Sequence, residues 1–116
     1  MHKVLDVWKL GIELVIKIYE ITSHFSPAEQ FGLTSQMQRA VVSVPSNIAE
    51  WAARNSEKEY LHFLYISLES LAELETQLII SQKLDFLNDD SIFEEVEKLR
   101  RKLLKFIKYF KEKKLD

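Results

Sequence analysis

The strongest constraint on the fold is the spacing of apolar residues in the last part of the chain. Here they recur at steps of 4, 3, 4, 3 and 4, at Ile92, Val96, Leu99, Leu103, Phe106 and Phe110. Alternating steps of three and four keep side chains on one face of an α-helix, and such a face must pack against another helix. The segment 92–110 is therefore predicted to be one helix of a helical bundle.

Two earlier segments carry a similar spacing. They consist of Val4, Val7, Gly11, Leu14, Ile18 and Ile21, and of Leu61, Leu64, Leu68, Leu71, Leu74 and Leu78. The 116 residues include only two Gly and two Pro. That is too few for the many turns of an all-β fold, and the period-two pattern of strands is also missing. The sequence thus predicts an all-α protein with long helices.

A fourth segment keeps its apolar phase across a proline. Its apolar residues lie on both sides of Pro45 and are Leu33, Met37, Ala40, Val44, Ile48 and Trp51. A proline inside a helix removes one backbone hydrogen bond and clashes with the carbonyl of residue 41, at a cost of roughly 3 kcal/mol. If the helix broke at Pro45, the apolar spacing would not be expected to continue in phase on both sides of the proline. We therefore predict one proline-kinked helix. Two helices with a tight break are the alternative.

The start of this second helix is preceded by a short turn. Ser26 is a typical N-cap residue, Pro27 suits the first helical position, and Glu29 completes a capping box. Gly32 interrupts the pattern soon afterwards. We therefore expect a short turn and then a helix from about Leu33.

The remaining connections are also short. Ser56 with Glu59 is a second capping box, residues 83–88 have the composition of a loop, and the last helix is expected to start within 88–91. Four amphipathic helices with short links predict an up-down-up-down four-helix bundle. No linker or repeat divides the chain, so residues 1–116 are expected to form a single domain.

The first and third helices carry additional apolar residues beside their main stripes. These are Trp8, Ile12, Val15 and Tyr19 in the first, and Tyr60 and Phe63 with Ile66 in the third. Exposed apolar stripes are uncommon on monomers, so these flanks predict a homo-oligomer with the residues at subunit interfaces. The alternative is that they are core contacts of broad bundle helices.

A polar stripe follows one face of the second helix. Its members are spaced by three or four residues and are Gln36, Arg39, Ser43, Asn47, Glu50 and Arg54. Ser43 and Asn47 can satisfy backbone groups that Pro45 leaves unpaired. We expect Ser43, Asn47 and Glu50 to serve structure or a subunit interface. A solvated face and a ligand site are the alternatives.

Positive charge is concentrated in the last helix, although the net charge of the chain is −2. Residues 1–90 contain 7 Lys and Arg against 13 Asp and Glu, whereas residues 91–116 contain 9 against 5. The predicted contact residues are Lys98, Arg101, Lys102, Lys105, Lys108 and Lys111. Such a stripe would attract phosphates independently of base sequence. Alternatively, it complements the helix dipole and keeps the protein in solution.

Catalytic and metal-binding patterns are missing from the sequence. There is no Cys, the three His residues form no metal-spaced pair, and there is no phosphate-binding glycine loop or nucleophile elbow. We expect no enzyme activity, no metal and no cofactor. Charged residues interrupt every apolar run, so no membrane partner is expected and the cytoplasm is the predicted location.

Two stretches resemble the four-helix-bundle proteins encoded in intervening sequences of bacterial 23S ribosomal RNA. They are FGLTSQMQRAVVSVPSNIAE, residues 31–50, and SLAELETQL, residues 70–78. The similarity extends over essentially the whole chain. This sequence departs from the pattern at Trp51, where the family usually has glycine, and at Gln38-Arg39, which replaces an arginine pair.

The resemblance implies a four-helix bundle that assembles as a homopentamer, and it implies no established activity. The chain is also similar to accessory proteins of diversity-generating retroelements, which share the pentameric form and are thought to bind nucleic acid and a reverse transcriptase. The expected function is accordingly a non-enzymatic accessory protein that contacts RNA or DNA through the last helix, with a partner protein as a further candidate. A purely structural or protein-binding scaffold without a nucleic-acid role is the alternative.

Overall fold

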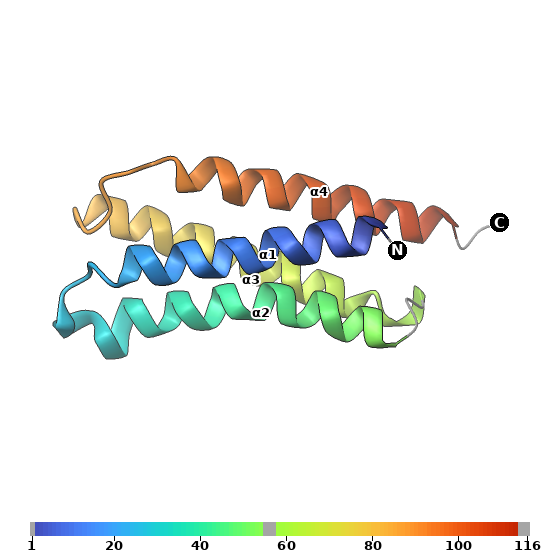
Figure 1. Cartoon of the computed structure of the whole chain (residues 1–116), viewed down its shortest axis with the longest axis horizontal. Coiled ribbons are helices and arrows are strands. Elements are labelled where there is room, and N and C mark those ends of the chain that lie inside the picture. The colour runs from blue at the N-terminus through green and yellow to red at the C-terminus, as the bar shows by residue number, and fades with distance from the viewer. Residues whose placement is uncertain (1, 55–57, 114–116) are drawn as a thin grey trace.

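Four antiparallel helices account for most of the chain (Figure 1). The computed structural model describes residues 2–54 and 58–113. The helices are α1 (His2–Thr22), α2 (Ser35–Ala53), α3 (His62–Lys83) and α4 (Ile92–Lys113), and no strand occurs within the described ranges. Each helix packs against its neighbour in sequence, and α1 also packs against α4. The predicted all-α, up-down-up-down bundle is confirmed.

The link between α1 and α2 is built from two short helical turns. The turn η1 (Pro27–Glu29) begins as predicted, since the Ser26 hydroxyl accepts a hydrogen bond from the Ala28 N–H at 3.2 Å. The π-helical turn η2 (Gln30–Thr34) follows, and its Gly32 has non-helical angles (φ −112°, ψ −112°). For this reason α2 begins at Ser35 rather than near Leu33.

The starts of α3 and α4 compare differently with the starts predicted from the sequence. The predicted cap Ser56 lies outside the described residues, and α3 follows a single 3₁₀ turn, η3 (Lys58–Tyr60). Before α4, the Asp89 carboxylate accepts the Ser91 N–H at 2.9 Å, and this hydrogen bond lowers the pKa of Asp89. The start of α4 at Ile92 directly follows the predicted range 88–91.

A left-handed residue ends α3. Asp85 has φ 62°, and the Phe86 N–H donates to the Ser81 carbonyl at 2.8 Å while the Asp85 N–H donates to the Gln82 carbonyl at 3.1 Å. These two bonds form a Schellman motif, which usually places glycine at the left-handed position. The cap also directs Phe86 onto Phe25, with ring centroids 5.6 Å apart.

Helix α2 runs without a break through Pro45, as the apolar phase predicted. The proline is buried, and its ring faces Gly11 of α1 so closely that a Cβ built on Gly11 would lie 3.2 Å from the Pro45 Cβ. On the α3 side, the Ser67 hydroxyl donates to the carbonyl of Val44 at 2.8 Å. The residue before the proline is thus anchored to a neighbouring helix.

The core lies along the inward faces that the apolar spacing identified. Trp51 extends it toward α4, because its ring packs edge-on against Phe106 and Phe110 at centroid distances of 5.1 and 4.8 Å. Trp51 is fully buried and lies within α2. The residue that departs from the resembled pattern is therefore a central contact between α2 and α4.

We predict that Gly11→Ala lowers the free energy of unfolding by about 1 kcal/mol, although alanine favours helices over glycine by a similar amount. The new methyl group would meet the rigid Pro45 ring, which cannot rotate away. Urea denaturation of the variant, beside Glu13→Ala at an exposed position of the same helix, measures the effect. A Gly11→Ala protein more stable than the wild type would show that α1 and α2 separate at no cost.

We expect Asp85→Gly to stabilise the protein by about 0.5–1 kcal/mol, because glycine adopts the left-handed conformation without a Cβ clash. Thermal unfolding measures the change. Asp85→Ala removes the same carboxylate but keeps a Cβ, so it serves as the control and should not stabilise. Equal stabilisation by both substitutions would assign the effect to the lost charge.

Candidate nucleic-acid interface

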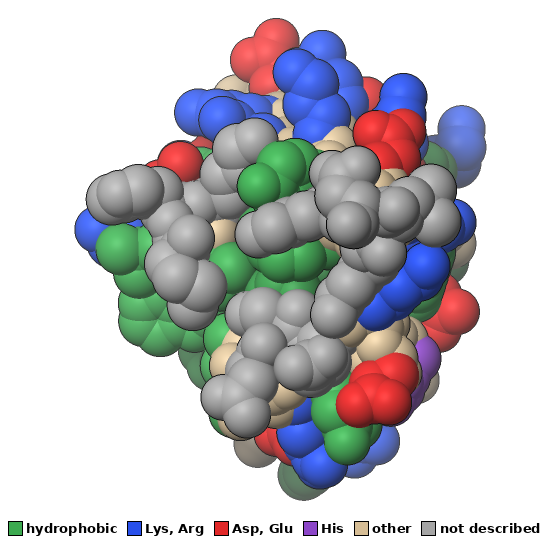
Figure 2. All heavy atoms as spheres, turned by 90° about the vertical axis from the view of Figure 1, so that its right-hand side faces the viewer, with side chains coloured by type: hydrophobic (Ala, Val, Ile, Leu, Met, Phe, Trp, Pro, Cys, Tyr) green, Lys and Arg blue, Asp and Glu red, His purple; other side chains and the backbone are tan. Residues whose placement is uncertain are grey.

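The outward face of α4 presents the basic residues that the sequence singled out. All six are exposed, and they are Lys98, Arg101, Lys102, Lys105, Lys108 and Lys111. Figure 2 shows Lys and Arg side chains gathered at the top of the molecule, the side on which α4 lies in Figure 1. The buried α4 residues turn the opposite way, so the helical period alone gives the basic residues their exposure.

Most of this charge is not neutralised by neighbours. Glu97 forms an ion pair with Arg100, which lowers the pKa of Glu97 and raises that of Arg100, and it lies 4.0 Å from Arg101. Within the described part of the chain, no ion pair reaches the five lysines of the stripe. Their ammonium groups can therefore interact with an incoming anion.

Lys98 is surrounded differently from the other five. It lines a hollow between α1 and α4 whose other charged residues are Glu13, Glu94 and Glu95. Glu95 also forms an ion pair with Lys17 of α1. Three carboxylates nearby weaken the attraction of Lys98 for phosphate, so the strongest positive field lies between residues 101 and 111.

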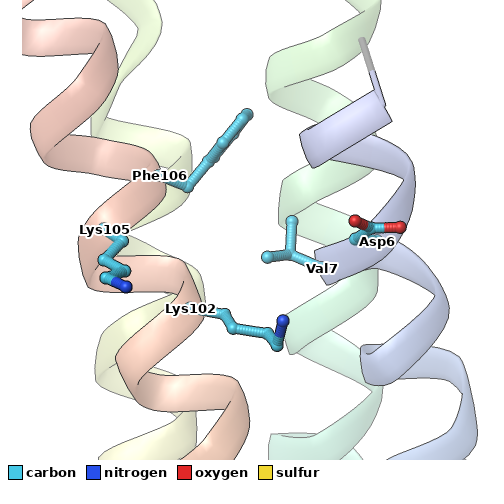
Figure 3. Close-up of a pocket in the computed structure, with 5 residues that line it drawn as sticks. All are labelled: Asp6, Val7, Lys102, Lys105 and Phe106. Carbon is cyan, nitrogen blue, oxygen red and sulfur yellow. The ribbon is translucent and has the colours of Figure 1, made fainter.

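A second hollow between α1 and α4 brings two of the predicted basic residues together with α1. It has a volume of about 280 Å³ and is lined by Asp6, Val7, Lys102, Lys105 and Phe106 (Figure 3). Lys102 reaches from α4 toward α1 in this view. The sequence identified Val7 as a core residue but did not place Val7 or Asp6 beside these lysines, because that contact depends on how the two helices pack.

The α3–α4 side has a further hollow near the end of α4. Its lining includes Tyr65, Leu104 and Ile107 together with Lys108 and Lys111. The Lys111 ammonium lies 5.9 Å from the centre of the Tyr65 ring, within reach of a cation–π interaction. The basic stripe of α4 thus borders a hollow on each flank.

The interface residues predicted on α1 have two different environments. Trp8 and Val15 are half-buried and pack against the core, whereas Ile12 and Tyr19 are 38% and 45% exposed. Leu5 and Ile16 are also exposed on this helix and were not singled out from the sequence. Their helical positions beside Ile12 were the available signal.

The interface residues predicted on α2 and α3 are linked by contacts within the chain. The Asn47 amide donates to the carbonyl and the hydroxyl of Ser43, at 2.9 and 3.0 Å, and the hydroxyls of Ser43 and Ser70 are 2.8 Å apart. One turn before the end of α2, Glu50 forms an ion pair with Arg54. Of these bonds, the one between Ser43 and Ser70 links α2 to α3, and the others are local to α2 and its C-terminal end.

Arg54 also connects the end of α2 to the start of α3. Its guanidinium lies 5.3 Å from the ring centre of Tyr60 and 5.5 Å from that of Phe63. Both aromatic residues are half-buried and pack against the core. The structure therefore brings Glu50, Tyr60 and Phe63 to one end of the α2–α3 surface.

Neither a metal-binding cluster nor a membrane-spanning helix occurs in the described ranges. Across the described residues, no group of three or more His, Cys, Asp or Glu side chains is arranged to hold a metal ion. None of the helices described is both long and apolar enough to span a membrane.

The sequence profile of the 23S rRNA-intervening sequence proteins matches residues 3–109. The chain belongs to this family. The match contains all of the predicted contact residues of α4 except Lys111, and it names no enzymatic activity. No curated protein matches the chain.

A crystal structure from Bacteroides thetaiotaomicron is similar in fold. It is described as a protein of unknown function from the S23 ribosomal protein family, with a TM-score of 0.82 and 21% sequence identity. The similarity covers 91% of this chain and 98% of the other. The two proteins thus share a fold at low sequence identity.

Proposed function

We propose that this member of the family is a non-enzymatic, oligomeric accessory protein that binds nucleic acid through the basic face of α4. The observation that supports this function is the set of exposed lysines on α4, which no described carboxylate pairs with. Lysines that contact the phosphates would release the counterions condensed on the nucleic acid, which makes binding favourable at low salt.

The negative net charge of the chain does not oppose this contact. Charges at exposed positions are screened over about 10 Å at ordinary salt concentration, so a phosphate responds to the cations beside it rather than to the total charge. The acidic residues are concentrated in residues 1–90, and the cations gather on α4. Binding through α4 would therefore fix the orientation of the protein on the nucleic acid.

Oligomerisation would strengthen these weak contacts. A single α4 stripe offers only a few phosphate contacts, and such contacts are individually weak at physiological salt. Several copies held together raise the effective concentration of each remaining stripe once the first has bound. A pentamer, as implied by the family resemblance, would present five such stripes.

Reversing the charge of Lys105 and Lys108 to Glu should abolish binding of RNA and single-stranded DNA. In wild-type protein, fluorescence anisotropy should show an affinity that falls steeply as salt rises, because each phosphate contact releases counterions. Lys9→Glu with Lys83→Glu changes the net charge equally but lies outside α4. Equal loss in both variants would assign binding to the overall charge, and no binding by wild type at low salt would refute the function.

A structural or protein-binding scaffold is the second candidate, and the exposed apolar flank of α1 favours it. Ile12→Glu with Tyr19→Glu should convert the oligomer to a monomer of 13.7 kDa in analytical ultracentrifugation, because charge is placed on two apolar residues that the interface would bury. Ile79→Glu with Tyr65→Glu makes the same change at similarly exposed positions of α3. Dissociation by the α3 pair alone would place the interface there, and a monomeric wild type would remove the oligomer from both candidate functions.

A further inference from the structure

The hollow between Asp6 and Phe106 combines features that a phosphate site does not need. Lys102 and Lys105 line the hollow on the α4 side and Asp6 on the α1 side; the Lys102 ammonium reaches toward α1, whereas the Lys105 side chain lies along α4 (Figure 3). Between them lie Val7 and Phe106, two core residues that are only 2% and 3% exposed. A phosphate held in this hollow would be repelled by Asp6 and would gain nothing from the apolar residues.

A nucleobase has the complementary chemistry. Its ring is apolar, its edge carries amino or carbonyl groups, and the phosphates attached through the sugar lie a few ångströms away. The volume of about 280 Å³ is close to the lower limit of ordinary ligand sites, which suits one base rather than a larger group. Lys102 and Lys105 could then bind the flanking phosphates at the rim.

We propose that this hollow accepts one unpaired base of a single-stranded nucleic acid and that Asp6 selects bases with an amino group. The inference rests on the proposed function, since the same α4 lysines would hold the backbone. A carboxylate accepts a hydrogen bond from the N4 amino group of cytosine. Thymine and uracil place a carbonyl oxygen at the corresponding position, which the carboxylate repels.

Tyr109 lies where it can stack against a neighbouring base. It is three residues beyond Phe106 and four beyond Lys105, so these side chains share one face of α4. Its ring is 41% exposed and packs edge-on against Phe110 at a centroid distance of 5.0 Å. Stacking of bases on exposed aromatic rings is a common means of binding single strands.

The test compares oligo(dC) and oligo(dT) of about 15 nucleotides, a length that single-strand-binding surfaces commonly span. Fluorescence anisotropy is measured at low salt and slightly alkaline pH, where cytosine stays unprotonated. Wild-type protein should bind oligo(dC) roughly fivefold more tightly than oligo(dT). Asp6→Asn should remove the preference, because an amide can donate to the thymine carbonyl as well as accept from cytosine.

Glu13→Gln is the matched control for Asp6→Asn. It also neutralises an acidic residue of α1 at a hollow facing α4, but at the hollow of Lys98, so it should keep the preference for oligo(dC). Equal binding of the two oligonucleotides by wild type, or a preference that persists in Asp6→Asn, would overturn the base site and leave the proposed function standing. Binding of neither oligonucleotide would overturn the base site, and if RNA also failed to bind at low salt the proposed function would fall with it.

The role of Tyr109 is tested with a second matched pair. Tyr109→Ala should weaken the binding of both oligonucleotides by about five- to tenfold, because stacking does not depend on base identity. Phe31→Ala removes an exposed aromatic ring from η2, outside α4, and should have little effect. Circular dichroism confirms that each variant is folded, and an unchanged affinity of folded Tyr109→Ala would remove Tyr109 from the site.

Discussion

Pro45 is held between two helices, and the geometry of the bundle depends on this contact. A proline inside a helix costs roughly 3 kcal/mol, so neighbouring contacts must offset its presence. Gly11 lets α1 approach the proline ring directly, while Ser67 of α3 donates a hydrogen bond to the carbonyl of Val44. A larger residue at Gly11 would move α1 away from α2, and α4 packs on α1 and would follow it. The position of the α1–α4 pair relative to α2 is therefore linked to the contact at Pro45.

The helices were predictable because apolar spacing reports directly on burial. In α4, the spacing identified the buried residues from Ile92 to Phe106 and consequently the exposed lysines on the opposite face. The phase across Pro45 likewise predicted an unbroken α2. The left-handed Asp85 was not predictable, since this conformation is usually signalled by glycine or asparagine. Its conformation follows from the Schellman bonds and from the packing of Phe86 on Phe25.

The candidate site was predictable only where it lies on a single helix. The helical period of α4 predicts the basic stripe. It does not predict that the lysines of the stripe have different neighbours in α1. Lys98 lies beside Glu13 of α1, and Lys102 lines a hollow with Asp6, because antiparallel packing aligns the end of one helix with the start of the other. No motif connects Asp6 with residues about 100 positions later in the chain. Such pairs become visible only when the helices are packed.

The apolar flank of α1 and the side of α1 that faces the α4 lysines point in different directions. Lys17 marks the side that faces α4, because it forms an ion pair with Glu95. At 100° per residue, Ile12 and Tyr19 are turned away from Lys17 by roughly 140° and 160°. A subunit that docked on this apolar flank would leave the lysines of α4 and the hollow beside Asp6 exposed. Assembly and nucleic-acid binding would therefore not compete for the same residues, and each copy in an oligomer could contribute its own α4 face.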